Sequence, residues 1–193
     1  MANKKTIALT TGNYNLIIDM LRSGFNNDDG KIIRPNERIA TALVIQANLG
    51  LRIGDVLRLR LNDFIKDGDR YRLNIVEAKT EKNRTFTVPI EIYNYIKMYC
   101  LENNLKATSK MFQISERAVQ KHLKTVTDFL RIEGVSTHSF RKYFATQIYV
   151  NNNYNIALVR ELLQHSTIAI TQKYIGISSA EVENALNNHI CLR

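Results

Sequence analysis

Two arginines and a histidine stand in sequence contexts that suit the binding of a phosphate group. Arg52 lies between the end of one apolar helical segment, at Gly50, and the start of the next. Backbone N–H groups point outward at a helix start, so an arginine placed there suits an anion. His138 and Arg141 are three residues apart at the start of another predicted helix, so they face the same side, and the helix dipole there favours a phosphate. Each segment also has a simpler interpretation: Arg52 would pair with Asp55 on the surface, and a histidine near a helix start is often structural.

Three further side chains have types that take part in phosphate chemistry. Lys79 lies in a polar turn between two predicted strands, where a lysine can reach a ligand and release it, although a solvated charge run is the commoner explanation. His165 ends one predicted helix, and Tyr174 follows nine residues later. A lone tyrosine on an apolar helix usually packs in the core. The interpretation of these residues therefore depends on how they occur together.

Helical periodicity accounts for most of the sequence and for the positions of these residues. Thr10 or Thr11 is a suitable N-cap for a first helix that ends near Ser23 and Gly24, and 26–35 is expected to be a loop. A helix over 115–131 has a core stripe of Val119, Leu123, Val126 and Leu130, with Lys121 and Lys124 among its polar residues. The other helices are expected at 37–49, 54–61, 91–103, 138–150, 155–164, around Tyr174, and at 179–188.

The β structure is expected to be small. Residues 71–76 and 85–88 alternate as strands, a turn at 67–69 closes a short hairpin, and Pro89 ends the pairing. The sequence shows no repeat, low-complexity tract or linker. It therefore predicts one domain over 1–193, mainly α with a small antiparallel β-sheet, which is an α+β fold.

The composition favours a partner that carries negative charge. The 193 residues contain 27 Lys and Arg against 18 Asp and Glu, a net charge of +9, and the calculated pI is 9.6. Such an excess favours nucleic acid, without choosing between DNA and RNA. No apolar run approaches the roughly 20 residues that span a bilayer, and the N-terminus does not resemble a secretory signal. We therefore expect a soluble cytoplasmic protein without a membrane partner, in which Cys100 and Cys191 are reduced thiols.

Taken together, the ordered residues resemble those of the tyrosine recombinase (phage integrase) family. The segment GLRIGDVLRLR is similar to the family's first-arginine segment, HSFRKYFAT to its HxxR helix, and LLQHSTIAITQKY to the segment that carries its second histidine and its tyrosine. The resemblance extends from about residue 10 to residue 180. It implies the catalytic-domain fold of that family and assigns catalytic roles to Arg52, Lys79, His138, Arg141, His165 and Tyr174.

The chain departs from the family pattern in three places. Lys142 stands where a further histidine is frequent, and Gln164 stands where glycine is usual. Neither change removes a residue from the catalytic set. Family members usually carry an N-terminal core-binding domain, and the first helix expected here begins almost at Met1, so that domain is expected to be absent from 1–193. Two explanations remain open: the chain is part of a longer protein, or it is a short member built from the catalytic domain.

The resemblance implies that the Tyr174 hydroxyl attacks a DNA phosphodiester, forms a 3′-phosphotyrosine and releases a 5′-hydroxyl. Tyrosine ionises near pH 10, so a phenol needs activation by a base or by nearby cations. Arg52 and Arg141 would hold the non-bridging oxygens with permanently charged forks, and His165 would donate another hydrogen bond to the phosphate.

The remaining implied roles concern protons and orientation. Lys79 would be the general acid for the leaving 5′ oxygen, because lysine shifts its pKa readily in a buried site. His138 would support proton transfer from the tyrosine, and Asp55 would orient the active-site side chains, unless it is a plain helix-surface residue. Because the covalent intermediate conserves the phosphodiester energy, the reaction requires no ATP, and we expect no cofactor and no metal.

The partner implied by the resemblance is double-stranded DNA, on which the protein would assemble as a homo-oligomer, a tetramer, in a bacterial or phage-encoded, nucleoid-associated system. The DNA-facing surface is expected to include Arg117, Lys121, Lys124 and Lys142. A C-terminal helix with Val182, Leu186 and Ile190 on one face would dock on a neighbouring protomer or fold back on its own core. Two alternative functions use the same fold: a type IB topoisomerase-like relaxing enzyme, and a DNA-binding module without catalysis.

Overall fold

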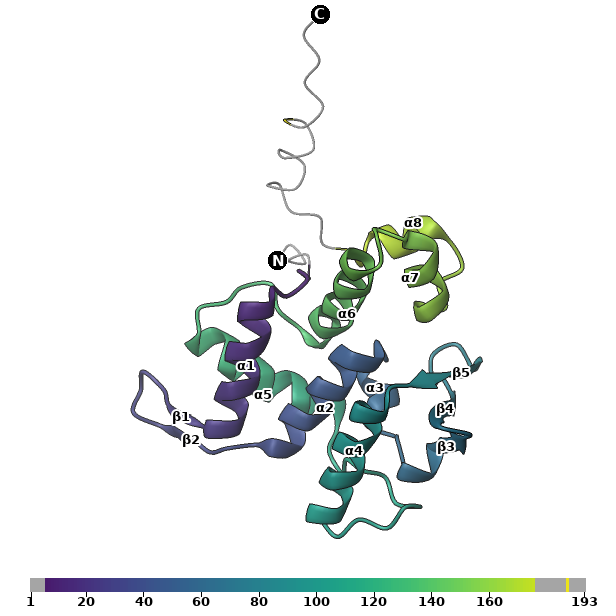
Figure 1. Ribbon diagram of the computed structural model, residues 1–193. Helices are drawn as coiled ribbons and strands as arrows, with labels where there is room; N and C mark the ends of the chain where they lie inside the picture. Colours follow the sequence, from purple (N-terminus) through teal and green to yellow (C-terminus); the bar gives the residue numbers. More distant parts are fainter. Residues whose placement is uncertain (1–5, 176–186, 188–193) are drawn as a thin grey trace, which may run out of the picture.

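The computed structural model describes residues 6–175 and Asn187, and most of these residues are helical (Figure 1). The helices are α1 (Thr11–Ser23), α2 (Glu37–Leu49), α3 (Ile53–Val56), α4 (Ile90–Glu102), α5 (Glu116–Phe129), α6 (Thr137–Asn151), α7 (Ile156–Leu163) and α8 (Ile168–Gln172). The strands are β1 (Phe25–Asn26), β2 (Ile32–Ile33), β3 (Phe64–Asp67), β4 (Arg70–Val76) and β5 (Asn83–Val88), and one 3-10 turn, Leu61–Asp63, precedes β3. This confirms the predicted fold class. No helix in the described part of the chain is both long and apolar enough to cross a membrane.

Helix α2 forms the centre of the main core. It is apolar almost all round, and α1, α3, α4 and α6 pack against it. Asn36 caps its start with a bond from the Ile39 N–H, and Gly50 ends it in the left-handed conformation that suits glycine, as the sequence predicted. A Cβ added at Gly50 would lie 2.4 Å from the Phe144 ring, so the absence of a side chain lets α6 approach the end of α2.

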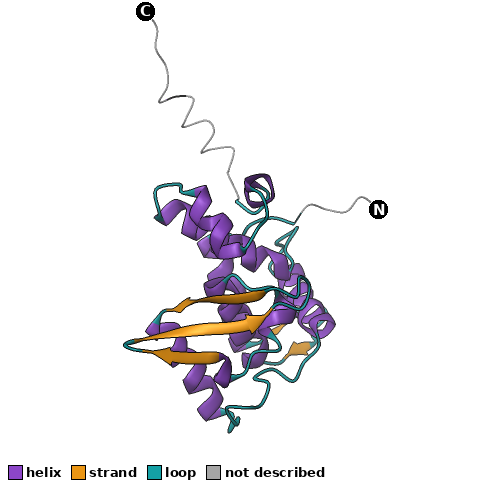
Figure 2. Ribbon diagram, turned by 90° about the vertical axis from the view of Figure 1, so that its right-hand side faces the viewer, coloured by secondary structure: helices purple, strands orange, loops and turns teal. Residues whose placement is uncertain are grey.

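A three-stranded antiparallel sheet lies beside this helical core (Figure 2). The hairpin of β3 and β4 pairs Phe64 with Leu73, and β5 pairs with β4 in the register Leu73 to Phe86 and Ile75 to Arg84. Arg84, Phe86 and Val88 alternate toward the interior along β5. The two predicted strands, β4 and β5, are therefore confirmed. The predicted turn at 67–69 joins β4 to an additional strand, β3.

Helices α6 and α7 and the turn after α8 share a second, smaller apolar cluster. Its buried members are Phe144, Ala145, Val159 and Leu163, and Tyr174 packs at its edge. Figure 1 shows α7 and α8 together at one end of α6, and α7 contacts both neighbours. Residues 156–175 are thus attached to the main core mostly through α6.

Two segments differ from the sequence prediction near the N-terminal half. The expected loop over 26–35 contains the short hairpin β1–β2, because the Asn27 N–H donates to the Lys31 carbonyl at 3.0 Å and the Asn27 side chain accepts from the Lys31 N–H at 2.7 Å. The helix predicted over 54–61 is wrong beyond α3. Its apolar residues Leu57 and Leu59 are both buried with an exposed residue between them, and the chain continues in an extended conformation.

One further difference concerns the C-terminal part, where another prediction lies outside the described residues. Helix α8 ends at Gln172, so Tyr174 lies in the turn that follows the helix. The helix predicted over 179–188, with Val182, Leu186 and Ile190, lies outside the described residues apart from Asn187.

Candidate active site

Arg141 occupies the centre of the site and is completely buried. It lies on α6, whose N-cap is Ser136. The Ser139 hydroxyl oxygen accepts a hydrogen bond from the Ser136 N–H at 3.1 Å. One terminal nitrogen donates to the Gly50 carbonyl, and the other donates to the Leu163 carbonyl at 3.0 Å. These carbonyls stand at the C-terminal ends of α2 and α7, where the helix dipole favours a cation. Burial and the neighbouring arginines lower the pKa of Arg141.

Arg52 lies at the N-cap of α3 and is partly open to solvent, with 24% of its side chain exposed. Its Nη1 donates to the Glu77 carboxylate over 2.5 Å. Although burial favours the neutral acid, the hydrogen bonds and charges of Arg52, Thr80 and Arg84 hold the pKa of Glu77 below its usual range. Arg52 is therefore fixed on one side by a buried carboxylate, rather than by the Asp55 pair that the simpler interpretation predicted.

Asp55 connects α3 to the turn that carries Lys79. Its Oδ1 accepts the Ala78 N–H at 2.9 Å and the Arg58 side chain at 3.0 Å, and the carboxylate is buried. The next residue after Ala78 is Lys79, which is exposed on the β4–β5 turn. Asp55 therefore anchors the base of the lysine turn. The buried environment expected for Lys79 is not found in this DNA-free structure.

His165 and Tyr174 lie side by side after α7 and α8. Their ring centroids are 4.6 Å apart, and the Arg141 guanidinium carbon lies 5.8 Å from the Tyr174 ring centroid. Nδ1 of His165 lies 3.2 Å from the Thr171 hydroxyl. Burial and the positive charges of Arg141, Arg52 and Arg84 lower the pKa of His165 to about 4. Tyr174 thus packs beside a histidine and an arginine, although Arg141 lies 33 positions earlier in the sequence.

His138 lies at the first turn of α6, at the exposed margin of the site. Partial burial and the charges of Arg141, Lys79 and Arg52 lower its pKa. Of the six predicted catalytic residues, Arg141, His165 and Tyr174 lie together, and Glu77 and Arg84 connect Arg52 to the end of α7, which leads to His165. Lys79 and His138 are exposed, Lys79 on the turn that Asp55 anchors and His138 on the helix that carries Arg141.

The predicted DNA-contact residues lie on α5 and α6. Arg117, Lys121 and Lys124 are exposed along α5, whose N-terminal end lies near α3, since Glu116 borders Gly54. Lys142 is half-buried, and its ammonium donates to the Thr6 carbonyl at 2.5 Å, so part of its hydrogen-bonding capacity joins the N-terminal segment to α6.

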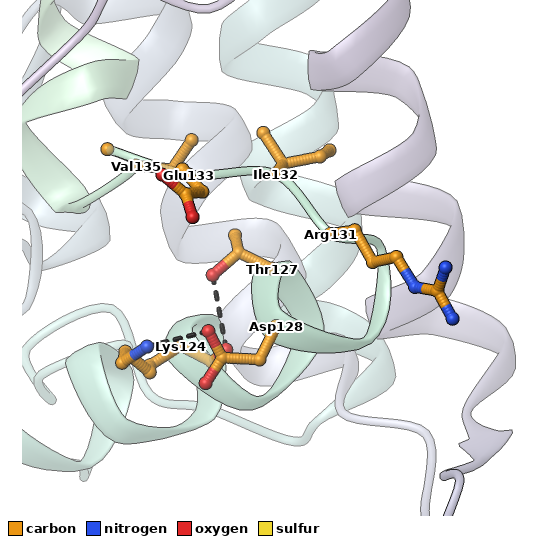
Figure 3. A pocket seen from close by; sticks show the side chains of 8 residues that line it. Lys124, Thr127, Asp128, Arg131, Ile132, Glu133 and Val135 are labelled. Atoms are coloured by element: carbon orange, nitrogen blue, oxygen red, sulfur yellow. Dashed lines mark hydrogen bonds and ion pairs between the residues drawn. The ribbon is translucent and has the colours of Figure 1, made fainter.

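A pocket at the C-terminal end of α5 contains none of the six catalytic candidates (Figure 3). In it Lys124 pairs with Asp128 at 2.6 Å, and Thr127 bonds back to the Lys124 carbonyl. Its walls are formed by the end of α5 and by 131–135, which lead into α6. The pocket is therefore a separate feature of the surface.

Two buried residues near the site, Glu77 and Arg84, were not singled out from the sequence, because both fell in a segment interpreted as a polar turn. Arg84 is 2% exposed and Glu77 is 1% exposed. The alternation of Val88 and Phe86, extended back by two residues, places Arg84 on the inner face of β5. That pattern was the available signal.

Comparison with known proteins relates this chain to a family. The model of the phage integrase family matches residues 13–181. The chain is 30% identical over 151 residues to a probable integrase/recombinase, YoeC, of Bacillus subtilis (strain 168), covering 76% of this chain and 81% of that protein. It is 25% identical over 185 residues to the tyrosine recombinase XerC of Caldanaerobacter subterraneus, covering 90% of this chain but 50% of that protein.

Solved structures share the fold at lower identity. The XerH site-specific recombinase bound to its difH substrate superposes with a TM-score of 0.72 at 19% identity, over 97% of this chain and 54% of that chain. The catalytic domain of bacteriophage HP1 integrase superposes with a TM-score of 0.61 at 19% identity, over 96% of both chains. The fold predicted from the resemblance is therefore confirmed, and this chain spans about half the length of the Xer proteins that it matches.

Proposed function

This chain belongs to the phage integrase family, and we propose that it is a site-specific recombinase that cuts and rejoins DNA through Tyr174. The observation that carries the proposal is the convergence of His165 and Arg141 on Tyr174, whose ring lies within 6 Å of both the His165 ring and the Arg141 guanidinium carbon. These groups come from α6 and from the segments that follow α7 and α8. A tyrosine that only filled the core would not require a histidine and an arginine beside its ring.

The proposed reaction is a transesterification. The Tyr174 oxygen bonds to phosphorus, the bond from phosphorus to the 5′ oxygen breaks, and the products are a 3′-phosphotyrosine and a free 5′-hydroxyl. The reverse attack by a 5′-hydroxyl rejoins the strand and releases the tyrosine. Since each step exchanges one phosphodiester for another, no nucleotide is consumed.

The arginines supply the charge stabilisation. Arg52 is partly exposed and keeps nitrogens that Glu77 does not occupy, so it is available to a non-bridging oxygen. Arg141 is 0% exposed, and its Nε has no partner within the described residues. A phosphate reaches it only if the groups that cover it, Tyr174 among them, shift when DNA binds. The small separate core of α6, α7 and Tyr174 is consistent with such a shift.

Protons are handled at the margin of the site. Lys79, on a turn anchored through Asp55, is the proposed acid for the 5′ oxygen. His138 is uncharged at neutral pH because its pKa is lowered, so it is able to accept the tyrosine proton. His165, also neutral, is proposed to donate to the phosphate through Nε2, in the tautomer whose Nδ1 accepts from the Thr171 hydroxyl.

Double-stranded DNA is the proposed partner, and a tetramer is the proposed assembly on it. Support comes from the net charge of +9 and from structural neighbours solved with DNA, including XerH and the Tn1549 transposon integrase. The relatives include proteins of Bacillus subtilis and of Acholeplasma phage L2, so we place the activity on bacterial nucleoid or phage DNA.

A covalent-capture experiment tests the nucleophile. Nicked duplexes of randomised sequence, which lose the short 5′ fragment after cleavage, should trap a covalent protein–DNA adduct and reveal the preferred site. Tyr174→Phe should abolish the adduct while leaving affinity for the selected duplex unchanged, and Tyr154→Phe, at an exposed tyrosine on the loop before α7, is the matched control. An adduct that persists in Tyr174→Phe contradicts the assignment. Relaxation of supercoiled plasmids that lack the selected site would instead favour a topoisomerase.

A further inference from the structure

We infer that Arg84 is a positioning residue for the cleavage reaction, and that it holds the end of α7 and the Arg52 side chain in a common arrangement. The inference rests on the proposed function for its kinetic consequences and on the DNA-free structure for its geometry. Arg84 makes no contact with Tyr174 in the described contacts and carries no proposed role in the chemistry itself.

Arg84 and Arg141 bridge the same two helix ends. Arg84 Nη2 donates to the Leu49 carbonyl at 3.2 Å and to the Leu162 carbonyl at 2.6 Å. Arg141 donates to the carbonyls one residue later in each helix, those of Gly50 and Leu163. The last carbonyls of a helix have no partner within the helix, and here two buried guanidinium groups satisfy them. The ends of α2 and α7 are thus joined by a pair of arginines, one of them from the sheet.

Glu77 extends this arrangement to Arg52. Its Oε1 accepts from Arg84 Nη1 at 3.2 Å and its Oε2 accepts from Arg52 Nη1 at 2.5 Å. Thr80 donates to the same Oε2 at 2.8 Å. Since Glu77 and Arg84 are almost fully buried, neither is free to move independently of the other. The sequence of contacts from α7 through Arg84 and Glu77 to Arg52 therefore fixes one phosphate-binding candidate relative to the other half of the site.

The position of His165 depends on this connection because α7 has little other attachment to the main core. Leu162 and Leu163 come directly before Gln164, which takes the left-handed conformation, and His165 follows. Leu163 packs in the small cluster of α6, α7 and Tyr174, not in the main core. Without Arg84, the carbonyl end of α7 would be held by Arg141 and by the Gln164 side chain, whose Nε2 donates to the Asn83 carbonyl at 3.3 Å. A displacement of about 1 Å at such a site is sufficient to reduce a rate by about 100-fold.

Lysine cannot replace this arginine geometrically. The planar guanidinium donates from separate nitrogens to a carboxylate and to two carbonyls, whereas an ammonium is a single point of charge. Arg84→Lys therefore preserves the charge beside Glu77 but loses part of the bridge. Glu77→Gln preserves the shape of the other partner and removes its charge, so it interrupts the same connection from the opposite side.

The first test uses the DNA-free protein and does not depend on cleavage. In Arg84→Lys, hydrogen exchange should accelerate at the amides of Gln164 and His165, which bond to Glu161 and Arg160, while amides in α2 and α4 stay protected. Arg72→Lys, on the neighbouring strand β4 with 50% of its side chain exposed, is the matched control. Unchanged exchange at 164–165, or a uniform acceleration over the whole chain, overturns the inference.

The second test measures single-turnover cleavage of the duplex selected by wild-type capture. Arg84→Lys should cleave about 10- to 100-fold more slowly with DNA affinity preserved, as expected for a misplaced group. In an Arg52→Ala background the same change should have a smaller effect, because its action passes partly through Arg52 and partly through α7. Should Arg84→Lys fail to fold, Glu77→Gln takes its place in both tests. Cleavage by Arg84→Lys at the full wild-type rate, or rate reductions that multiply in the double variant, overturns the inference. If the wild-type protein forms no adduct, the proposed function is contradicted, and the hydrogen-exchange test alone decides the inference.

Discussion

At the scale of single residues, the site is dominated by positive charge that has few carboxylates to balance it. Arg52, Arg84 and Arg141 lie close enough to influence one another, and Glu77 is the buried acid that contacts two of them. Neighbouring cations disfavour any further positive charge. The two histidines respond by remaining neutral, so the site gathers its charge on groups that do not titrate near neutral pH.

His165 is expected to affect stability at acidic pH. The unfolded chain protonates this ring near pH 6.5, whereas the folded chain does so only near pH 4, because burial and the arginines disfavour the cation. The unfolded state thus binds more protons between these values, so the free energy of unfolding falls as the pH is lowered from about 6.5 to about 4. His165→Gln should reduce this fall, as measured by urea denaturation at a series of pH values.

An NMR titration provides the direct measurement. The ring resonances of His165 should shift with a midpoint near pH 4 in the DNA-free protein. A midpoint at the ordinary value near 6.5 would contradict the proposed proximity of the arginines.

At the scale of elements, local sequence patterns were sufficient to predict most of the helices. They were insufficient to predict the turns and contacts that join the helices. The helix boundaries at the N-caps Thr10 and Asn36 and at the terminal glycines Gly24 and Gly50 depend on residues close in sequence, so they were predictable. The hairpin β1–β2 was not, because it depends on the side chain of Asn27 closing its turn. The inward position of Arg84 depends on carbonyls of Leu49 and Leu162, which are 35 and 78 residues away in the sequence.

The catalytic candidates illustrate the same difference. Their types and order were readable from the sequence, and a resemblance to a family related them. The contacts that hold them in place were not predictable from the sequence. The bond of Glu77 with Arg52, and those of the helix-end carbonyls with Arg141, join segments that are far apart in the sequence and ambiguous on their own. The placement of Tyr174 after the end of α8 likewise follows from how the last turn packs.

Gly50 is expected to be the glycine on which the packing of α6 against α2 depends. Its φ is 60°, and an added Cβ would lie 2.4 Å from the Phe144 ring. Gly68 has a similar φ of 65° but nothing within 4 Å, so it is a matched control for backbone strain alone. Gly68→Ala should cost about 1–2 kcal/mol, and Gly50→Ala should cost a further 1–3 kcal/mol, roughly, from overpacking.

Denaturant unfolding of the two variants measures this difference. Equal losses of unfolding free energy would mean that Phe144 moves aside without cost. A Gly50→Ala loss that Phe144→Leu partly restores would identify the ring as the obstacle.

At the scale of the whole molecule, the excess of nine positive charges should appear as a steep dependence of DNA affinity on salt. Each phosphate contact releases counterions, so the logarithm of the binding constant falls with the logarithm of salt concentration by about 0.9 for each contact on duplex DNA. Charges that face the DNA contribute to this slope, and charges elsewhere contribute little. The slope therefore distinguishes surface charge in general from a binding face.

The basic residues of α5 should contribute unequally to that slope. Arg117 lies at the end of α5 beside α3, next to Glu116, which borders Gly54, whereas Lys124 lies about two turns further along and pairs with Asp128 at 2.6 Å. Arg117→Ala should therefore reduce the slope by about 1, and Lys124→Ala should reduce it less, because Asp128 already neutralises part of its charge. Fluorescence-anisotropy titrations with the selected duplex at several salt concentrations measure both, with Lys97→Ala on α4 as the control. If Lys124→Ala lowers the slope as much as Arg117→Ala does, the proposed gradient along α5 is wrong, and the DNA-facing surface extends to the pocket at the end of that helix.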